Sequence, residues 1–123
     1  GFGCKQVIAV DSQILPKRHE HATIKWHKGN ARNLDFISSG SIARIVTDPP
    51  WGVYDNKTEQ DLSLLYTDFT KEMQRVLKPS GVAVVITGWP QAERVVTQHL
   101  KLIAKWSVLV SGKKATIFKL QKT

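Results

Sequence analysis

Residues 42–52 read Ile-Ala-Arg-Ile-Val-Thr-Asp-Pro-Pro-Trp-Gly. The first five form a mostly apolar, β-branched run that predicts a buried strand, and the chain leaves it through an acid, two prolines, an aromatic and a glycine. Asp48 and Pro49 each precede a proline, which disfavours helical backbone at both positions. The prolines also have a fixed φ and no N–H group. The stretch therefore predicts a rigid strand exit that is rich in hydrogen-bond acceptors and carries one flat ring, that of Trp51.

Such an exit suits a planar group that bears an NH2, such as a nucleobase with an exocyclic amine. The Asp48 carboxylate and nearby backbone carbonyls can accept hydrogen bonds from the amine, and Trp51 offers a stacking face. Gly52 allows a close approach of other backbone. The alternative is a plain rigid exit with Trp51 as a core residue. The preceding strand, the glycine and a second strand-end acid, Asp11, favour the functional interpretation.

The segments before this stretch are short. Residues 6–10 are predicted to form a strand that ends at Asp11, and residues 23–27 alternate as a second strand. Residues 28–33 have the composition of a turn. Residues 12–22 fit a short helix, although a proline interrupts the pattern.

The segments after it are clearer. Thr58, with Asp61 three residues on, predicts a helix start, and an apolar stripe continues to Leu77. Residues 78–81, Lys-Pro-Ser-Gly, are expected to end this helix as a turn. Residues 82–87 are apolar on both faces, as in a central parallel strand.

The last segments predict a second helix and a hairpin. Pro90 suits the first turn of a helix whose apolar face continues through His99 to Ile103. Two strands, at residues 106–110 and 115–120, are joined by a turn.

Alternation of strands and helices, ending in a hairpin, predicts an α/β sheet that is mostly parallel with one antiparallel strand. Ligands of such sheets bind at the carboxyl ends of the strands. Asp11, Asn30 and Asp48 all follow predicted strand ends, so we expect them to share one edge of the sheet.

The composition points to a nucleic-acid partner. The chain has 123 residues with 18 basic and 10 acidic side chains, which gives a net charge of +8. No apolar run approaches the ~20 residues of a membrane helix, so no membrane partner is expected. One cysteine, Cys4, suggests a reducing compartment, the cytoplasm or the nucleus.

A metal site is not expected. The four histidines do not lie at ligand spacing with a cysteine or a carboxylate cluster. His99 falls on the apolar face of the second predicted helix and is interpreted as a packed residue.

The order Val10-Asp11, Gly29-Asn30-Ala31 and Asp48-Pro49-Pro50-Trp51 resembles class I S-adenosylmethionine-dependent methyltransferases that modify amino nitrogens. More narrowly, residues 47–52 and 75–81 resemble the RNA methylase group that includes THUMP-associated tRNA guanine-N2 methyltransferases. The resemblance implies a Rossmann-like sheet with a C-terminal β-hairpin, S-adenosylmethionine as cofactor, and RNA, in particular tRNA, as partner.

The resemblance also implies roles. Asp11 would accept hydrogen bonds from the ribose hydroxyls of the cofactor, since a carboxylate can take two donors at once. Asn30 and Ala31 would lie by the cofactor adenine, although this family often has aspartate at the first of these positions. The catalytic group comprises Asp48, Pro49, Pro50 and Trp51. Asp48 and the Pro49 carbonyl would hold the target amine, Trp51 would stack on the base, and Asp48 would also adjoin the cofactor.

The similarity begins at the second strand of that family. Its first strand, glycine-rich loop and first helix have no counterpart, so residues 1–123 are interpreted as a partial methyltransferase catalytic domain. In the family the first strand lies between the strands formed here by residues 6–10 and 42–47. We therefore expect two half-sheets with unpaired edges, completed by a missing N-terminal segment or a partner chain, or else direct pairing of the two halves. We also expect residues 1–123 by themselves to be a poor methyltransferase.

The function implied is methylation of guanine N2 in tRNA. Adenine N6 in RNA or DNA remains open, because the Asp-Pro-Pro-aromatic motif does not distinguish the two amines. A second class is a non-catalytic nucleic-acid-binding or scaffold subunit that keeps the fold without the cofactor loop. A nucleotide-binding dehydrogenase-like domain ranks last, because its glycine-rich fingerprint is absent.

Overall fold

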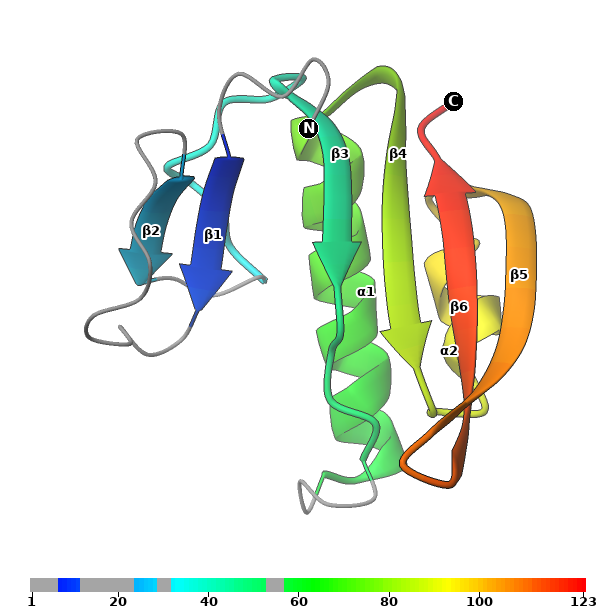
Figure 1. The fold of residues 1–123 in the computed structure, drawn as a ribbon. Coiled ribbons are helices and arrows are strands. Elements are labelled where there is room, and N and C mark those ends of the chain that lie inside the picture. Colours follow the sequence, from blue (N-terminus) through cyan, green and yellow to red (C-terminus); the bar gives the residue numbers. More distant parts are fainter. Residues whose placement is uncertain (1–6, 12–23, 29–31, 53–56) are drawn as a thin grey trace.

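The computed structural model describes residues 7–11, 24–28, 32–52 and 57–123, and these form six strands and two helices. The strands make two sheets (Figure 1). In the first, β1 (Val7–Asp11) pairs in parallel with β2 (Ile24–Lys28). The second has the order β3-β4-β6-β5.

The larger sheet mixes parallel and antiparallel pairs. Strand β3 (Ile42–Thr47) runs parallel to β4 (Leu77–Thr87). Strand β6 (Lys113–Gln121) is antiparallel to both β4 and β5 (Lys101–Val110). The prediction of an α/β sheet with one reversed strand is therefore confirmed.

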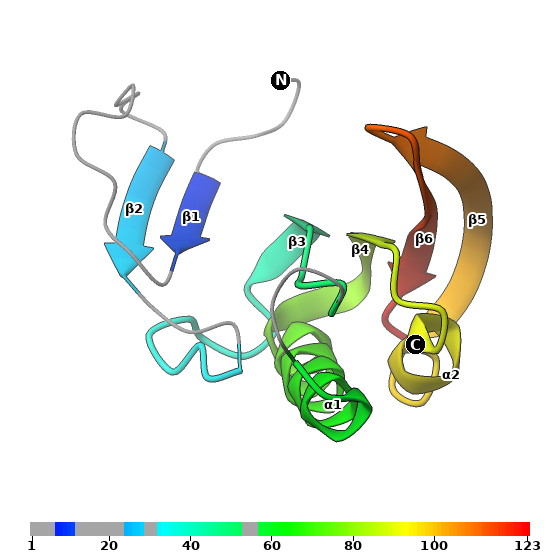
Figure 2. The same ribbon diagram turned by 90° about the horizontal axis from the view of Figure 1, so that it is seen from below.

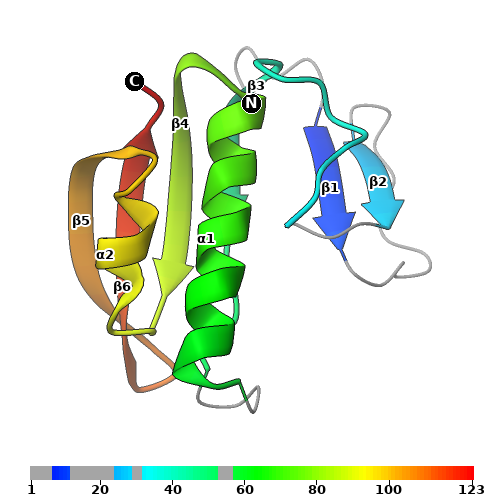
Figure 3. The ribbon, with the colours of Figure 1, turned by 180° about the vertical axis from the view of Figure 1, so that it is seen from behind.

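The two sheets lie side by side, with β1 nearest β3 (Figures 1 and 3). No hydrogen bonds join these two strands in the described part of the chain, so each keeps one edge without a strand partner. This is the split into half-sheets that the sequence predicts, and direct pairing of the halves is not observed.

Both helices cover the same face of the larger sheet (Figure 2). Helix α1 (Glu59–Val76) begins with a capping box: the Thr58 side chain accepts from the backbone N–H of Asp61, and the Asp61 carboxylate accepts from the backbone N–H of Thr58. This second bond is the main cause that lowers the pKa of Asp61 below its usual 3.8. The predicted helix start is thus confirmed in its atomic detail.

The core lies between the helices and the sheet. The stripe that the sequence places on the first helix is buried there, as are the inward-facing residues of β4 and β6. Tyr66, Ala83, Val85 and Leu120 have no exposed surface. On the opposite face the β4 residues are only half-buried, and Trp106 on β5 is 51% exposed.

The structure corrects the prediction that Lys78–Gly81 forms a turn. The proline ends α1 as expected, but the following residues belong to β4 and do not form a separate turn. Ile42 pairs with Leu77 and Arg44 with Val82, so the intervening β4 residues bulge out of the ladder. Ser80 adopts φ 64° to allow this.

The second helix is shorter in the structure than the sequence predicts. Helix α2 contains only Ala92–Val96, and the residues from Lys101 onward belong to β5. Thr97 follows the last helical residue, and its hydroxyl donates to the Glu93 carbonyl at 2.6 Å. The helix stops short because the chain from Lys101 onward pairs with β6 as strand β5. His99 therefore lies between α2 and β5, and Ile103 is on a strand and 44% exposed.

The hairpin is confirmed, with longer strands than predicted. Its turn is Ser111-Gly112, and both residues have positive φ, 51° and 78°. Two positive φ values match the twist of the flanking strands.

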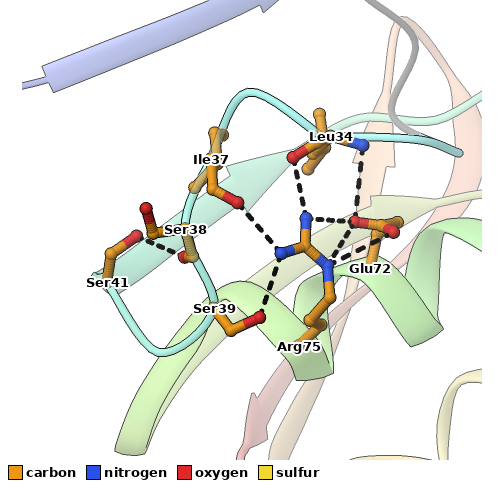
Figure 4. Close-up of polar contacts among 7 residues, drawn as sticks. All are labelled: Leu34, Ile37, Ser38, Ser39, Ser41, Glu72 and Arg75. Carbon is orange, nitrogen blue, oxygen red and sulfur yellow. Dashed lines mark hydrogen bonds and ion pairs between the residues drawn. The ribbon is translucent and has the colours of Figure 1, made fainter.

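The segment that leads into β3 is held against α1 by Arg75 (Figure 4). The guanidinium donates to the carbonyls of Leu34 at 2.7 Å and Ile37 at 2.9 Å. It also pairs with Glu72, which lies one turn earlier on the helix, at 2.8 Å. Arg75 therefore fixes the path of the chain just before the strand that carries the Asp-Pro-Pro motif.

Candidate active site

The carboxyl ends of the parallel strands point the same way, and the Asp48 motif leaves β3 at that end (Figures 1 and 3). Asp11 is the last residue of β1, and β2 ends at Lys28. The predicted cofactor residues Asn30 and Ala31 follow β2 but lie outside the described residues. The backbone thus brings Asp11 and Asp48 to the same side of the two sheets.

The motif is internally bonded. The Trp51 indole Nε1 donates to the Asp48 Oδ1 at 3.0 Å. Asp48 is exposed, Pro49 is buried, and Trp51 is half-buried. One carboxylate oxygen of Asp48 is therefore oriented by the aromatic ring three residues on, while the carboxyl group stays accessible from solvent.

Tyr66 of α1 holds the motif in place through its hydroxyl group. Its hydroxyl donates to the Pro50 carbonyl at 2.7 Å and lies 2.6 Å from the Thr87 hydroxyl at the end of β4. Thr87 in turn accepts from the backbone N–H of Trp89 at 3.0 Å. All the buried polar side-chain atoms in the described part of the chain have partners. This network ties the exits of β3 and β4 to one helix.

A glycine at the end of β4 makes room for Trp51. A Cβ built on Gly88 would lie 2.4 Å from Cε3 of the Trp51 ring, closer than any real contact. The indole therefore packs directly against the Gly88 backbone, and any side chain there would displace it.

Two aromatic rings, those of Trp89 and Tyr66, pack against each other in this site. Trp89 lies edge-on to Tyr66 with ring centroids 4.6 Å apart, and its Nε1 donates to Glu59 at 3.0 Å. Trp89 is 4% exposed. The ring of Trp51 is therefore the more accessible of these two indoles.

Four residues of this site are not predicted from the sequence: Tyr66, Thr87, Gly88 and Trp89. Tyr66 falls within the apolar stripe predicted for this helix, which accounts for its buried ring but not for the bonds of its hydroxyl. A buried tyrosine needs a hydrogen-bond partner, and this need was the signal available in the sequence. Gly88 carried no local signal, because its requirement comes from a ring 37 positions earlier in the chain.

The described residues contain neither a metal-binding group nor a helix that could cross a membrane. No group of three or more His, Cys, Asp or Glu side chains lies together there as a metal site would need. No described helix is long and apolar enough to cross a membrane.

Comparison with known proteins gives a family. A family model described as "RMKL-like, methyltransferase domain" matches residues 15–109. No curated protein matches the sequence closely enough to serve as a relative.

Solved structures share the fold. TrmN from Thermus thermophilus superposes with a TM-score of 0.70 at 24% identity, over 83% of this chain and 29% of that one. The N-methyltransferase NodS from Bradyrhizobium japonicum, in complex with S-adenosyl-L-homocysteine, gives 0.66 at 14% identity, over 97% and 67%. A putative DNA modification methylase from Thermus thermophilus gives 0.62 at 16%, over 95% and 53%.

The chain thus spans less than a third of TrmN, while its sheet and helices superpose on methyltransferases of several kinds. The predicted Rossmann-like methyltransferase fold is confirmed. Because the family model covers more than half of its length, the chain belongs to the RMKL-like methyltransferase domains.

Proposed function

We propose that this chain carries the target-amine site of an S-adenosylmethionine-dependent methyltransferase that acts on an exocyclic amino group of a nucleobase in RNA, with guanine N2 of tRNA as first candidate. The observation that carries the proposal is the Asp48 motif. A rigid exit at the carboxyl end of a parallel strand presents an accessible carboxylate beside an indole ring.

The bonds within the site leave defined acceptors for an amine. Tyr66 occupies the Pro50 carbonyl and Trp51 occupies the Asp48 Oδ1. The proposal therefore assigns the target N–H groups to the Asp48 Oδ2 and the Pro49 carbonyl. Two acceptors on its hydrogens would draw an amine toward tetrahedral geometry and free the nitrogen lone pair for attack.

The residues fit the cofactor that the family implies. Asp11 ends a parallel strand on the side where Asp48 leaves β3, and a carboxylate can accept from two ribose hydroxyls. Asp11, with Asn30 and Ala31 after β2, would hold the nucleoside part. When bound, S-adenosylmethionine would supply an electrophilic methyl group on sulfonium. The chain's own part is to bind, orient the amine and stabilise the charge that develops on it.

The test is methyl transfer with Asp48→Asn. The full enzyme that contains this domain, given labelled S-adenosylmethionine and tRNA, is expected to yield N2-methylguanosine on nucleoside digestion of the tRNA. The variant keeps the shape of Asp48 but loses the charge, so the rate should fall by about 10²-fold or more. Asp35→Asn, an exposed acid before β3, is the matched control and should not change the rate.

Other products decide between the candidates. N6-methyladenosine in place of N2-methylguanosine would move the target to adenine, which shares the same amine chemistry. RNA binding without any methyl transfer, equal in wild type and Asp48→Asn, would contradict the enzyme and support a binding or scaffold subunit.

A further inference from the structure

A groove of about 650 Å³ opens beside the Asp48 motif. One wall is the exit of β4, Thr87 to Pro90, and the other is the end of the β5–β6 hairpin. The hairpin wall is formed by residues 107–109 of β5 and 114–116 of β6. Because strand side chains alternate, Ser107 and Leu109 share one face of β5, and Thr116 and Lys114 are their partners on β6. The groove therefore mixes hydrogen-bonding, apolar and cationic groups on a surface that the proposed amine site does not use.

The groove adjoins the proposed amine site at one residue. Gly88 lines the groove, and the same residue packs against the Trp51 ring. A nucleotide whose base lies against Trp51 would thus have its neighbour in the strand directed toward the hairpin.

The hairpin concentrates the positive charge of the chain. The hairpin, residues 101–121, contains five basic side chains and no acidic one, while the whole chain has a net charge of +8. Lys105 is paired with Glu93 at 2.8 Å, and the Lys122 ammonium donates to the Leu77 carbonyl at 2.8 Å. Lys113 and Lys114 begin β6 at the hairpin tip, and both are exposed.

The positive charge of the hairpin and the position of the groove together indicate which kind of molecule binds there. An acidic protein surface would meet the lysines but would make no use of a groove that adjoins an aromatic ring. A single-stranded nucleic acid presents phosphates at regular spacing and flat bases between them, and proteins bind it with a basic track beside apolar and aromatic surfaces.

We propose that the β5–β6 hairpin is a phosphate-binding arm for single-stranded RNA, and that the groove between it and residues 87–90 takes the nucleotide next to the methylated one. This inference rests on the proposed function for the position of the target base. The phosphate contacts themselves do not depend on which amine is methylated.

The experiment measures the binding of a fluorescent single-stranded RNA oligonucleotide at several salt concentrations. In Lys113→Ala/Lys114→Ala the slope of log K against log salt should fall by about 1.4, because each lost phosphate contact on a single strand is worth ~0.7. Lys71→Ala/Lys78→Ala removes two exposed lysines from the end of α1 and the start of β4, away from the hairpin tip, and should keep the wild-type slope.

A second pair of variants tests the groove itself. Ser107→Glu places a carboxylate in the groove, while Gln98→Glu adds the same charge at an exposed site between α2 and β5. We expect the first to weaken RNA binding roughly tenfold, the worth of one stacked base, and the second to leave it near wild type. Affinity for S-adenosylmethionine should be equal in all four variants.

Equal slopes for the wild type and the hairpin variant would overturn the proposal, as would wild-type protein that does not bind the oligonucleotide. Equal weakening by the hairpin and control variants would also overturn it, since that result reports net charge alone. A DNA oligonucleotide that binds more tightly than RNA would contradict the choice of RNA. The nucleoside product, measured separately, tests the proposed function, so the two can fail independently.

Discussion

At the scale of single residues, the hydroxyl of Tyr66 links a buried helix to the exposed motif. The ring fills the core, and the hydroxyl reaches both the Pro50 carbonyl and Thr87. One side chain therefore serves packing and the geometry of the site, and the two roles can be separated by removing a single oxygen.

Tyr66→Phe should lower the free energy of unfolding by ~1–3 kcal/mol, because the Pro50 carbonyl loses its donor in a partly buried place. It should also slow methyl transfer more than it weakens cofactor binding, since the proline exit is no longer fixed. Chemical denaturation and single-turnover rates provide the two measurements.

Thr70→Val is the control for this change. The Thr70 hydroxyl is also fully buried on α1, but it bonds only to the Tyr66 carbonyl within the helix. A loss of methyl transfer in Thr70→Val as large as in Tyr66→Phe would show that stability alone, and not the position of Pro50, governs the rate.

At the scale of elements, α1 organises what comes before and after β3. Its first half holds the motif through Tyr66, and its second half holds the approach to β3 through Arg75. Farther along the same approach, Asp68 accepts from Arg32 at 2.6 Å. Strand β3 and both its ends are therefore positioned by a single helix.

Arg75→Ala should lower the free energy of unfolding by about 1.5–3 kcal/mol, the range for hydrogen bonds to a charged group, with the lower end expected because Arg75 is one-third exposed. Two backbone carbonyls and Glu72 lose their donor. Thermal unfolding measures the loss, and hydrogen exchange at residues 34–41 should rise.

Arg75→Lys keeps the charge but has one ammonium in place of a planar fork, so it should restore only part of the stability. Arg94→Ala, an exposed arginine on α2, should be neutral. Full stability in Arg75→Lys would mean that the charge, and not the geometry of the fork, holds the segment.

At the scale of the whole molecule, the proposed cofactor site draws on both sheets. Asp11 belongs to the β1–β2 sheet, and Asp48 leaves the larger one. Calorimetric titration with S-adenosylmethionine should show binding that Asp11→Ala abolishes. Ligand at 100 times Kd should stabilise the wild type by about 2.7 kcal/mol in a thermal melt.

A cooperative melt that the ligand does not shift would contradict this prediction. If Asp11→Ala binds as well as the wild type, the ribose assignment is wrong and another residue at this edge must hold the hydroxyls.

Patterns that repeat along the chain allowed most of the fold to be predicted from sequence. The strand before Asp48, the cap at Thr58 and the stripe of α1 depend on neighbouring residues, and each was found. The short α2 and the strand at Lys78–Gly81 depend on pairing with distant strands, which no local pattern contains. The rigid strand exit at Asp48 depends on neighbouring residues and could be predicted. The roles of Gly88 and of the Tyr66 hydroxyl depend on contacts with distant residues, so only the structure shows them.

Among the residues that the structure describes, β4 is the one strand that pairs with β3, and Val46 on β3 is 74% exposed. A row of free amide and carbonyl groups beside an exposed valine is a template on which further copies can assemble. Arg44 in the middle of the strand would oppose stacking by charge repulsion, which salt weakens. Concentrated solutions of this chain should therefore be clearer at low ionic strength than at high, the reverse of ordinary salting-in.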